Sequence, residues 1–182
     1  MKLENQYLLV EASEDGAEIT KIYNKEDGTD IIWEGNPEFW KRHSPVLFPN
    51  VGKTYKNKML INGEEYTTSQ HGFARDSVFE CVESTDSMVS FLLNSSEETK
   101  KKYPFDFKLF INYYLEGKEV KVEWKVENTG NETMYFTIGA HPAFIHPYWE
   151  AMAESRICGN LGSRFPLSME SAIMLQSLSR FP

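Results

Sequence analysis

Strict alternation of apolar and polar residues between positions 107 and 126 constrains the fold of this chain most strongly. In residues 120–126, three valines and a tryptophan alternate with two lysines and a glutamate. Residues 107–115 carry Phe, Leu, Ile, Tyr and Leu at every second position. A period of two is typical of strands with one buried face. The short polar link at residues 116–119 therefore predicts an antiparallel hairpin.

Similar short runs predict further strands along the chain. The Asn62-Gly63 pair predicts a tight turn between residues 59–61 and 64–66, because both residue types tolerate positive φ angles. Residues 95–102 are polar and predict a connection with at most a turn or two of helix. Many short strands joined by tight turns predict an all-β sandwich or barrel. The other predicted strands are 7–10, 17–23, 31–33, 78–82, 88–93 and 134–138.

Composition excludes several classes of protein. Aromatic residues make up 14% of the chain, more than is typical of a disordered segment. The net charge of −8 argues against binding to nucleic acid, which needs a basic surface. No stretch approaches the ~20 apolar residues that span a membrane. Two cysteines and an N-terminus without an apolar leader predict a cytoplasmic location.

The composition changes near residue 150. Residues 1–150 contain fourteen Lys and two Arg, whereas residues 151–182 contain three Arg, six Ser and no Lys or Asp. Strand alternation also stops there. We therefore divide the chain into a β-sandwich at residues 1–146 and an atypical tail at 147–182. The tail is either a natural segment packing on the sheet or a segment of different coding origin, such as a frameshift, and the composition favours the second interpretation.

Two of the four histidines, His71 and His141, lie in polar loops at predicted strand ends. Small neighbours let another group approach each backbone closely. Together with Arg75 they form a plausible acid/base and hydrogen-bonding constellation. For either histidine alone, a purely structural role is the favoured interpretation. Two histidines without a third ligand do not indicate a metal site.

Three blocks of sequence carry a resemblance to a known family. They are residues 44–52 (SPVLFPNVG), 70–76 (QHGFARD) and 139–144 (GAHPAF). In this order and spacing they resemble the aldose 1-epimerase (galactose mutarotase) family, in particular its LacX-like branch, over about residues 1–145. The resemblance implies an antiparallel β-sandwich of the galactose mutarotase (supersandwich) type, truncated in this chain.

The resemblance also implies roles for the two histidines. A histidine in the position of His141 is the general acid that protonates the ring oxygen of the sugar, and one in the position of His71 binds the sugar and supports the developing charge. A histidine with a pKa near ~6.5 is a suitable proton donor at neutral pH. The implied ligand is a small sugar, and no metal or organic cofactor is implied.

Five further residues form the predicted substrate-binding set. Gln70 and Arg75 match residues that contact sugar hydroxyls or a phosphate, and Lys53 matches a basic position. Asn50 lies in the first block. Phe73 is a candidate for stacking on the sugar, as is Phe144, although a core role beneath the loops is the favoured alternative for both.

Three functions remain open from the sequence. The first is an isomerase that interconverts the α and β anomers of a free hexose. The second is a hexose 6-phosphate mutarotase, with Lys41, Arg42, Lys53 and Arg75 around the phosphate. The third is a catalytically silent carbohydrate-binding protein or truncated remnant.

The general base is the part of the family pattern that this chain does not match. In the family it is a glutamate from the second half of the domain, and none of Glu150, Glu154 and Glu170 lies in a segment that resembles it. We therefore expect a poor catalyst. Unpaired strand edges in a truncated sandwich would also favour association with another chain, including a second copy.

Overall fold

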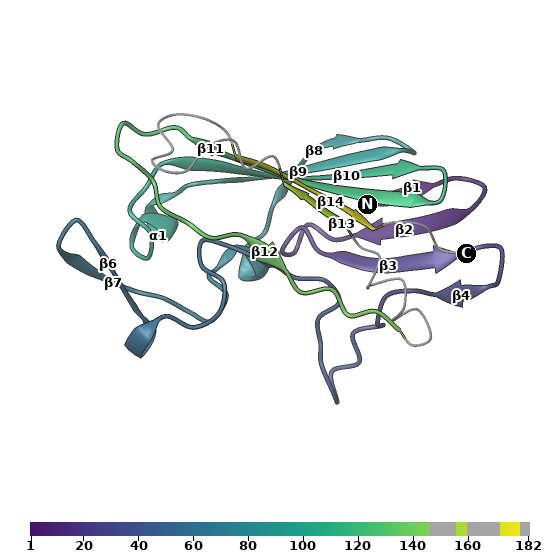
Figure 1. Ribbon diagram of the computed structural model, residues 1–182, viewed down its shortest axis with the longest axis horizontal. Coiled ribbons are helices and arrows are strands. Elements are labelled where there is room, and N and C mark those ends of the chain that lie inside the picture. Colours follow the sequence, from purple (N-terminus) through teal and green to yellow (C-terminus); the bar gives the residue numbers. More distant parts are fainter. Residues whose placement is uncertain (146–155, 160–171, 179–182) are drawn as a thin grey trace.

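The computed structural model describes residues 1–145, 156–159 and 172–178 (Figure 1). Its secondary structure is almost entirely antiparallel strands, arranged in two larger sheets. The first sheet has four strands in sequence order: β1 (Lys2–Glu4), β2 (Leu8–Ala12), β3 (Ile19–Asn24) and β4 (Thr29–Asp30).

The second sheet has six strands in the order β13-β14-β11-β10-β9-β8. Its two central strands form the hairpin that the alternation predicts, which confirms that part of the sequence analysis. The bounds of the six strands are β8 (Glu80–Ser84), β9 (Met88–Asn94), β10 (Phe107–Glu116), β11 (Glu119–Asn128), β13 (Arg156–Gly159) and β14 (Ala172–Leu178).

Shorter elements complete the described chain. β5 (Val46–Leu47) pairs with β12 (Gly139–Ala140), and β6 (Lys58–Ile61) pairs with β7 (Glu64–Thr67) through the predicted Asn-Gly turn. Both turn residues have positive φ, as that turn requires. Three short helices are η1 (Tyr55–Asn57), η2 (Ala74–Asp76) and α1 (Glu97–Lys100).

The core lies between the two larger sheets, so the fold is an all-β sandwich. Leu109 and Ile111 of β10 face the first sheet and are fully buried, and their neighbours in β9 and β11 are apolar as well. The hydroxyl of Tyr113 donates a buried hydrogen bond of 2.6 Å to the carbonyl of Ala17, which ties the two layers together. Figure 1 shows the purple strands of the first sheet lying against the green strands of the second.

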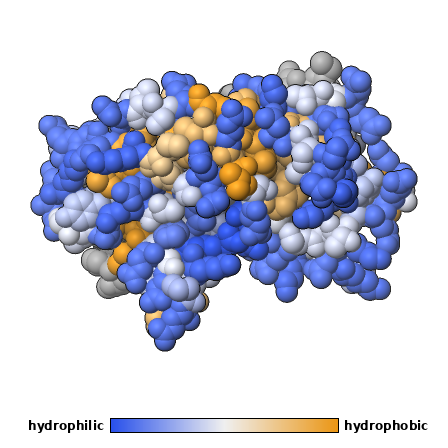
Figure 2. Space-filling model, turned by 180° about the vertical axis from the view of Figure 1, so that it is seen from behind, coloured by the Kyte–Doolittle hydropathy of each residue, from blue (hydrophilic) through white to orange (hydrophobic). Residues whose placement is uncertain are grey.

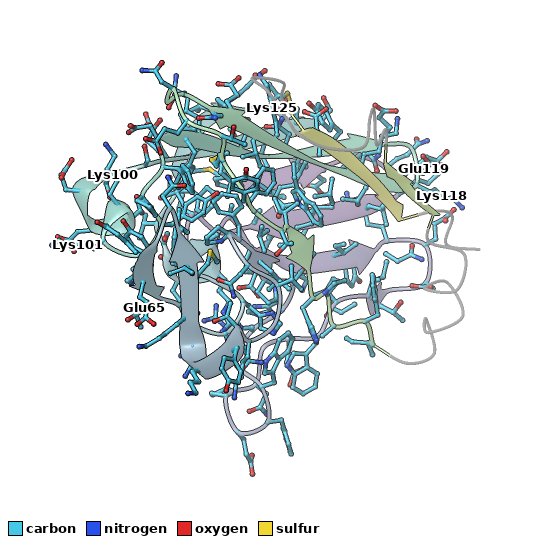
Figure 3. The ribbon with its side chains drawn as sticks, turned by 60° about the vertical axis from the view of Figure 1, so that its left-hand side comes forward. Glu65, Lys100, Lys101, Lys118, Glu119 and Lys125 are labelled. Atoms are coloured by element: carbon cyan, nitrogen blue, oxygen red, sulfur yellow. The ribbon has the colours of Figure 1, made fainter. Side chains whose placement is uncertain are left out.

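The outer surface is mostly polar. Lys100, Lys101 and Lys125 lie at the periphery of the molecule, where water solvates their charges (Figure 3). Viewed from behind, the surface is largely hydrophilic, and a band of apolar residues interrupts it (Figure 2). In the part of the chain that the structure describes, no helix has the length and apolar character needed to cross a membrane.

Two predicted strands are wrong. Residues 31–33 form only an isolated bridge, between Ile32 and Phe144, and residues 134–138 form no strand. Each segment is apolar because it packs on the core, but neither has a neighbour to pair with over several residues. Strands β1 and β5, which the sequence analysis did not predict, are short and gain their pairing partners from elsewhere in the chain.

The tail contains two strands that the sequence analysis did not predict. The backbone of β14 pairs with β11 over seven residue pairs, and β13 pairs with β14. A free strand edge presents unpaired N–H and C=O groups, so covering β11 satisfies them. The boundary at residue 146 and the coding origin of the tail stay predictions.

The link between the layers leads to a stability prediction. Tyr113→Phe should destabilise the protein by about 1–2 kcal/mol, because it leaves the buried carbonyl of Ala17 without its donor. Tyr135→Phe is the matched control, because that ring is 62% exposed and should change stability little. Urea unfolding measures both, and equal effects of the two substitutions would contradict the prediction.

Candidate functional site

The extended segment at residues 45–52 holds one histidine loop on each side. On one side, β5 pairs with β12, and the backbone N–H of His141, directly after β12, donates to the carbonyl of Pro45 at 3.1 Å. Thr137 adds two more contacts, because its N–H donates to Pro49 and its hydroxyl accepts from the N–H of Val51. These bonds fix where the backbone of His141 leaves the sheet.

On the other side, the same segment holds the loop that carries His71. The carbonyl of Phe48 accepts hydrogen bonds from the N–H groups of Phe73 and Ala74, at 2.9 and 3.1 Å. The N–H of His71 donates to the carbonyl of Gly52 at 2.8 Å. Gly72 has a φ of +70°, and a Cβ there would lie 2.1 Å from the Phe48 oxygen, so only glycine fits this approach.

As a result the two histidines lie side by side, although seventy positions separate them in the sequence. Their ring centroids are 6.3 Å apart. The His141 ring is exposed and has no hydrogen-bond partner among the residues that the structure describes. It is therefore free to meet a ligand.

The His71 ring is held in one tautomer. Its Nδ1 accepts a hydrogen bond of 3.0 Å from the N–H of Gly52, so the proton of the neutral ring sits on Nε2. The amide nitrogen of Gln70 lies 3.3 Å from Nε2, and because both atoms then carry protons, a hydrogen bond between these two side chains requires the Gln70 amide to turn its oxygen toward the ring. Partial burial, followed by the positive charges of Arg75 and His141, lowers the pKa of His71. At neutral pH, His71 is thus a neutral hydrogen-bond donor beside His141.

Arg75 connects Gln70 to the neighbouring loop. One of its guanidinium nitrogens, Nη2, donates to the carbonyl of Gln70 at 2.8 Å, while its buried Nε has no hydrogen-bond partner within the described chain. Burial and the nearby charge of Arg42 lower the pKa of Arg75. Arg75 therefore braces the backbone next to His71, and Gln70 projects an exposed amide.

The other three predicted binding residues lie in different settings. Asn50 is buried, and its amide nitrogen donates to the carbonyls of Gly52 and Ser69 at 3.1 Å each. Phe73 is 8% exposed and packs edge-on against Phe48 within the core, which is the alternative that the sequence favours. Lys53 is exposed next to the histidine loops in sequence.

Sequence reasoning missed two residues of this region, Trp40 and Glu18. The ring of Trp40 lies 5.6 Å from that of His141, centroid to centroid. The buried carboxylate of Glu18 accepts hydrogen bonds from the N–H groups of His43 and Ser44, immediately before the central segment. Trp40 lies in a loop, where the sequence has no periodicity, and Glu18 has the position of a polar residue on the outer face of a strand. Neither pattern indicates a functional residue.

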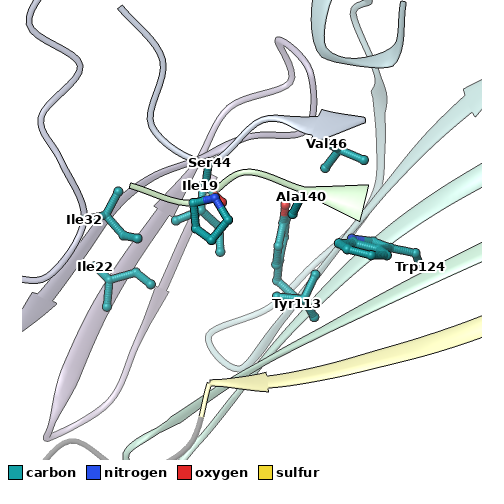
Figure 4. Close-up of a pocket in the computed structure, with 10 residues that line it drawn as sticks. Ile19, Ile22, Ile32, Ser44, Val46, Tyr113, Trp124 and Ala140 are labelled. Carbon is teal, nitrogen blue, oxygen red and sulfur yellow. The ribbon is translucent and has the colours of Figure 1, made fainter. Parts of the chain in front are cut away.

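A small apolar pocket lies against β12, the strand directly before His141 (Figure 4). Ile22, Tyr113 and Trp124 line it, with Ala140 of β12 on the site side. Its volume is about 20 Å³, which is room for about one water molecule. A hexose cannot enter it, so the site is the exposed surface around the histidines. Among the described residues, no cluster of His, Cys, Asp or Glu is suited to hold a metal ion.

Comparisons with known proteins agree with the three sequence blocks. A sequence model of the family described as aldose 1-epimerase matches residues 1–157. The chain belongs to the aldose 1-epimerase family. It is 34% identical over 156 residues to the plasmid-encoded protein LacX of Lactococcus lactis subsp. lactis, and the match covers 82% of this chain and 52% of LacX.

Solved structures of the family confirm the fold. A galactose mutarotase-like protein from Lactobacillus casei ATCC 334 superposes with a TM-score of 0.77 at 38% identity, covering 79% of this chain and 49% of that one. A galactose mutarotase related enzyme from Lactobacillus acidophilus gives a TM-score of 0.79 at 33% identity, covering 98% and 65%. The chain spans about half the length of the curated relatives it matches.

The close approach at Gly72 leads to a second stability prediction. Gly72→Ala should cost roughly 2–4 kcal/mol, because the added Cβ meets the Phe48 carbonyl and the positive φ is strained. Gly117→Ala is the matched control: it has a φ of +58° and open space around the Cβ, so it should cost only about 1 kcal/mol. Chemical denaturation of both variants checks this. Equal losses of stability in the two variants would mean that the contact between Gly72 and the Phe48 carbonyl does not exclude a side chain.

The setting of His71 leads to a titration prediction. Its pKa should lie below the ordinary value of 6.5, and Arg75→Gln should raise it, because a nearby positive charge that disfavours protonation is removed. NMR titration of the histidine ring protons measures both. Lys125→Gln, which removes a charge on the outer face, should leave it unchanged. A wild-type midpoint at or above 6.5 would contradict the prediction.

Proposed function

We propose that this chain binds a free aldohexose at the histidine pair and promotes interconversion of its α and β anomers. The observation that carries the proposal is the pairing of an exposed His141 with a neutral, orientationally fixed His71 at a ring separation of 6.3 Å. Family membership supports a sugar as the ligand.

The chemistry assigns a different task to each histidine. His141 as the imidazolium gives its proton to the ring oxygen, the bond from that oxygen to the anomeric carbon breaks, and the anomeric hydroxyl loses its proton to a base. The product is the open-chain aldehyde. Rotation about the adjacent carbon–carbon bond and closure in reverse give the other anomer. His71 donates its Nε2 proton in a hydrogen bond to a sugar oxygen and remains uncharged throughout.

Among the described residues, no carboxylate forms a hydrogen bond or an ion pair with the ring of His71 or His141, so the base in this scheme is unassigned. The charges that act on His71 come from Arg75 and His141, both of them positive. Glu150, Glu154 and Glu170, the acidic residues considered from the sequence, lie outside the described residues. Water can take the proton instead. A missing general base typically costs ~10²–10⁴-fold in rate, so we propose that this chain binds sugar well and catalyses slowly.

A hexose 6-phosphate is the second candidate substrate, on one specific observation. The guanidinium groups of Arg42 and Arg75 are close enough for the charge of Arg42 to lower the pKa of Arg75. Two neighbouring guanidinium groups can bind a phosphate through charge-assisted hydrogen bonds. However, Arg42 already donates to Asp76 and to the carbonyl of Arg75, and a phosphate would have to displace the carboxylate.

The test is sugar binding and anomer exchange by the full chain. We expect NMR titration to show binding of glucose or galactose, weakened by about tenfold or more in His141→Ala and His71→Ala, since each removes a polar contact that the bound sugar would use. Lys125→Ala, on the outer face, should bind as the wild type does. Polarimetry should show exchange only modestly above the uncatalysed rate.

Each other outcome of this test has a definite meaning. A fast rate of anomer exchange that His141→Ala abolishes would show that a general base is present after all. Binding with no acceleration at all would identify a silent sugar-binding protein. Tighter binding of glucose 6-phosphate than of glucose, lost in Arg75→Gln, would favour the phosphorylated substrate. If no sugar binds, the proposal fails.

A further inference from the structure

Trp40 is the residue beside the histidine pair whose role neither the core nor the acid/base chemistry explains. Its ring lies 5.6 Å from that of His141, and the two planes are tilted by 59°. The side chain is half-buried, so part of the indole is open to solvent. The three rings of Trp40, His141 and His71 thus form a row, with His141 in the middle.

Hydrogen bonds in the loop around Trp40 fix the backbone from which the indole projects. The N–H of Trp40 donates to the carbonyl of Asn36 at 2.9 Å, and its carbonyl accepts from the indole N–H of Trp33 at 2.8 Å. His43 closes the loop from the other end, with its Nε2 3.1 Å from the carbonyl of Glu34. Because the backbone of Trp40 is fixed in this way, the loop loses little freedom when a ligand packs on the indole.

The indole N–H of Trp40 is also available. No group in the described part of the chain accepts a hydrogen bond from it, and it is not among the buried unpartnered atoms. Trp40 therefore offers a ligand an apolar face and a polar edge together. A pyranose ring has the complementary character, because one of its faces is rich in C–H groups while its rim carries hydroxyls. Aromatic rings present a negative face that attracts such polarised hydrogens.

We propose that Trp40 is the platform on which the sugar ring packs, orienting the ring oxygen toward His141. This inference rests on the proposed function. It gives Trp40 the stacking role for which the sequence offered Phe73, a residue that is buried in the core. It also gives the site a preference: closed pyranose rings bind, and an acyclic polyol such as sorbitol, which has the hydroxyls but no flat face, binds poorly.

The first experiment follows the protein without altering it. In a ¹H–¹⁵N spectrum of the full chain, the indole resonance of Trp40 should shift as galactose is added, with the same dissociation constant as the His141 ring signals. The backbone N–H resonance of Lys125, on the outer face of the second sheet, should stay in place. If galactose saturates the His141 signals and leaves the Trp40 indole unmoved, the platform assignment is overturned.

The second experiment uses variants and calorimetry. Trp40→Ala should weaken galactose binding by about tenfold or more, whereas Trp40→Phe, which keeps a face but loses the N–H, should weaken it by about two- to fivefold. Phe39→Ala is the control, because that neighbouring ring is 74% exposed and is not among the rings that contact the histidines. Sorbitol should bind weakly to wild type and equally weakly to Trp40→Ala.

The two proposals fail in different ways. If wild type binds galactose and Trp40→Ala binds it equally well, the platform is wrong and the proposed function stands. If wild type binds no hexose at any concentration, the proposed function is wrong and the platform falls with it. The indole shift provides the decision if Trp40→Ala does not fold.

Discussion

The candidate site depends on backbone hydrogen bonds that radiate from the extended segment at residues 45–52. Its Phe48 carbonyl holds the loop of His71, and its Pro45 carbonyl holds His141. The side chain of His71 adds one bond of its own to this segment, from the N–H of Gly52 to Nδ1. Backbone bonds of this kind are insensitive to most side-chain changes, so much of the site geometry is a property of the fold. The close approach at position 72 adds a requirement for glycine.

Part of the fold and site follows from the sequence, and the limits have physical causes. The hairpin at residues 107–128 is predictable because both strands alternate and pair over their whole length. Residues 31–33 and 134–138 are equally apolar but lack a pairing partner, which local pattern cannot reveal. The two histidines come together through contacts between distant segments, so the sequence could mark each of them as a candidate, by its place at a predicted strand end and by the family blocks, but not their separation. Trp40 lies in a loop, where no periodicity marks a functional ring.

Some polar residues of the candidate site hold the histidine loops in place, and others project into solvent. Asn50 and Arg75 both donate to backbone carbonyls of the histidine loops, although the sequence motif groups them with Gln70 as ligand contacts. A substitution at either would move a loop of the candidate site. The residue types in a motif therefore do not reveal whether a side chain contacts the ligand or supports a loop, whereas its hydrogen-bond partners in the structure do.

The hydrogen bond from Gly52 to His71 has a consequence for acid conditions. While Nδ1 is an acceptor, it pins the loop at residues 69–72 to the central segment. Protonation would place a second N–H opposite the Gly52 N–H, and two donors facing each other repel. One proton would then both charge the ring and remove one of the bonds that hold the loop, while the backbone bonds to Gly52 and Phe48 remain. The contact that fixes the tautomer of the neutral His71 ring thus becomes unfavourable in acid, and this part of the fold responds locally to protonation.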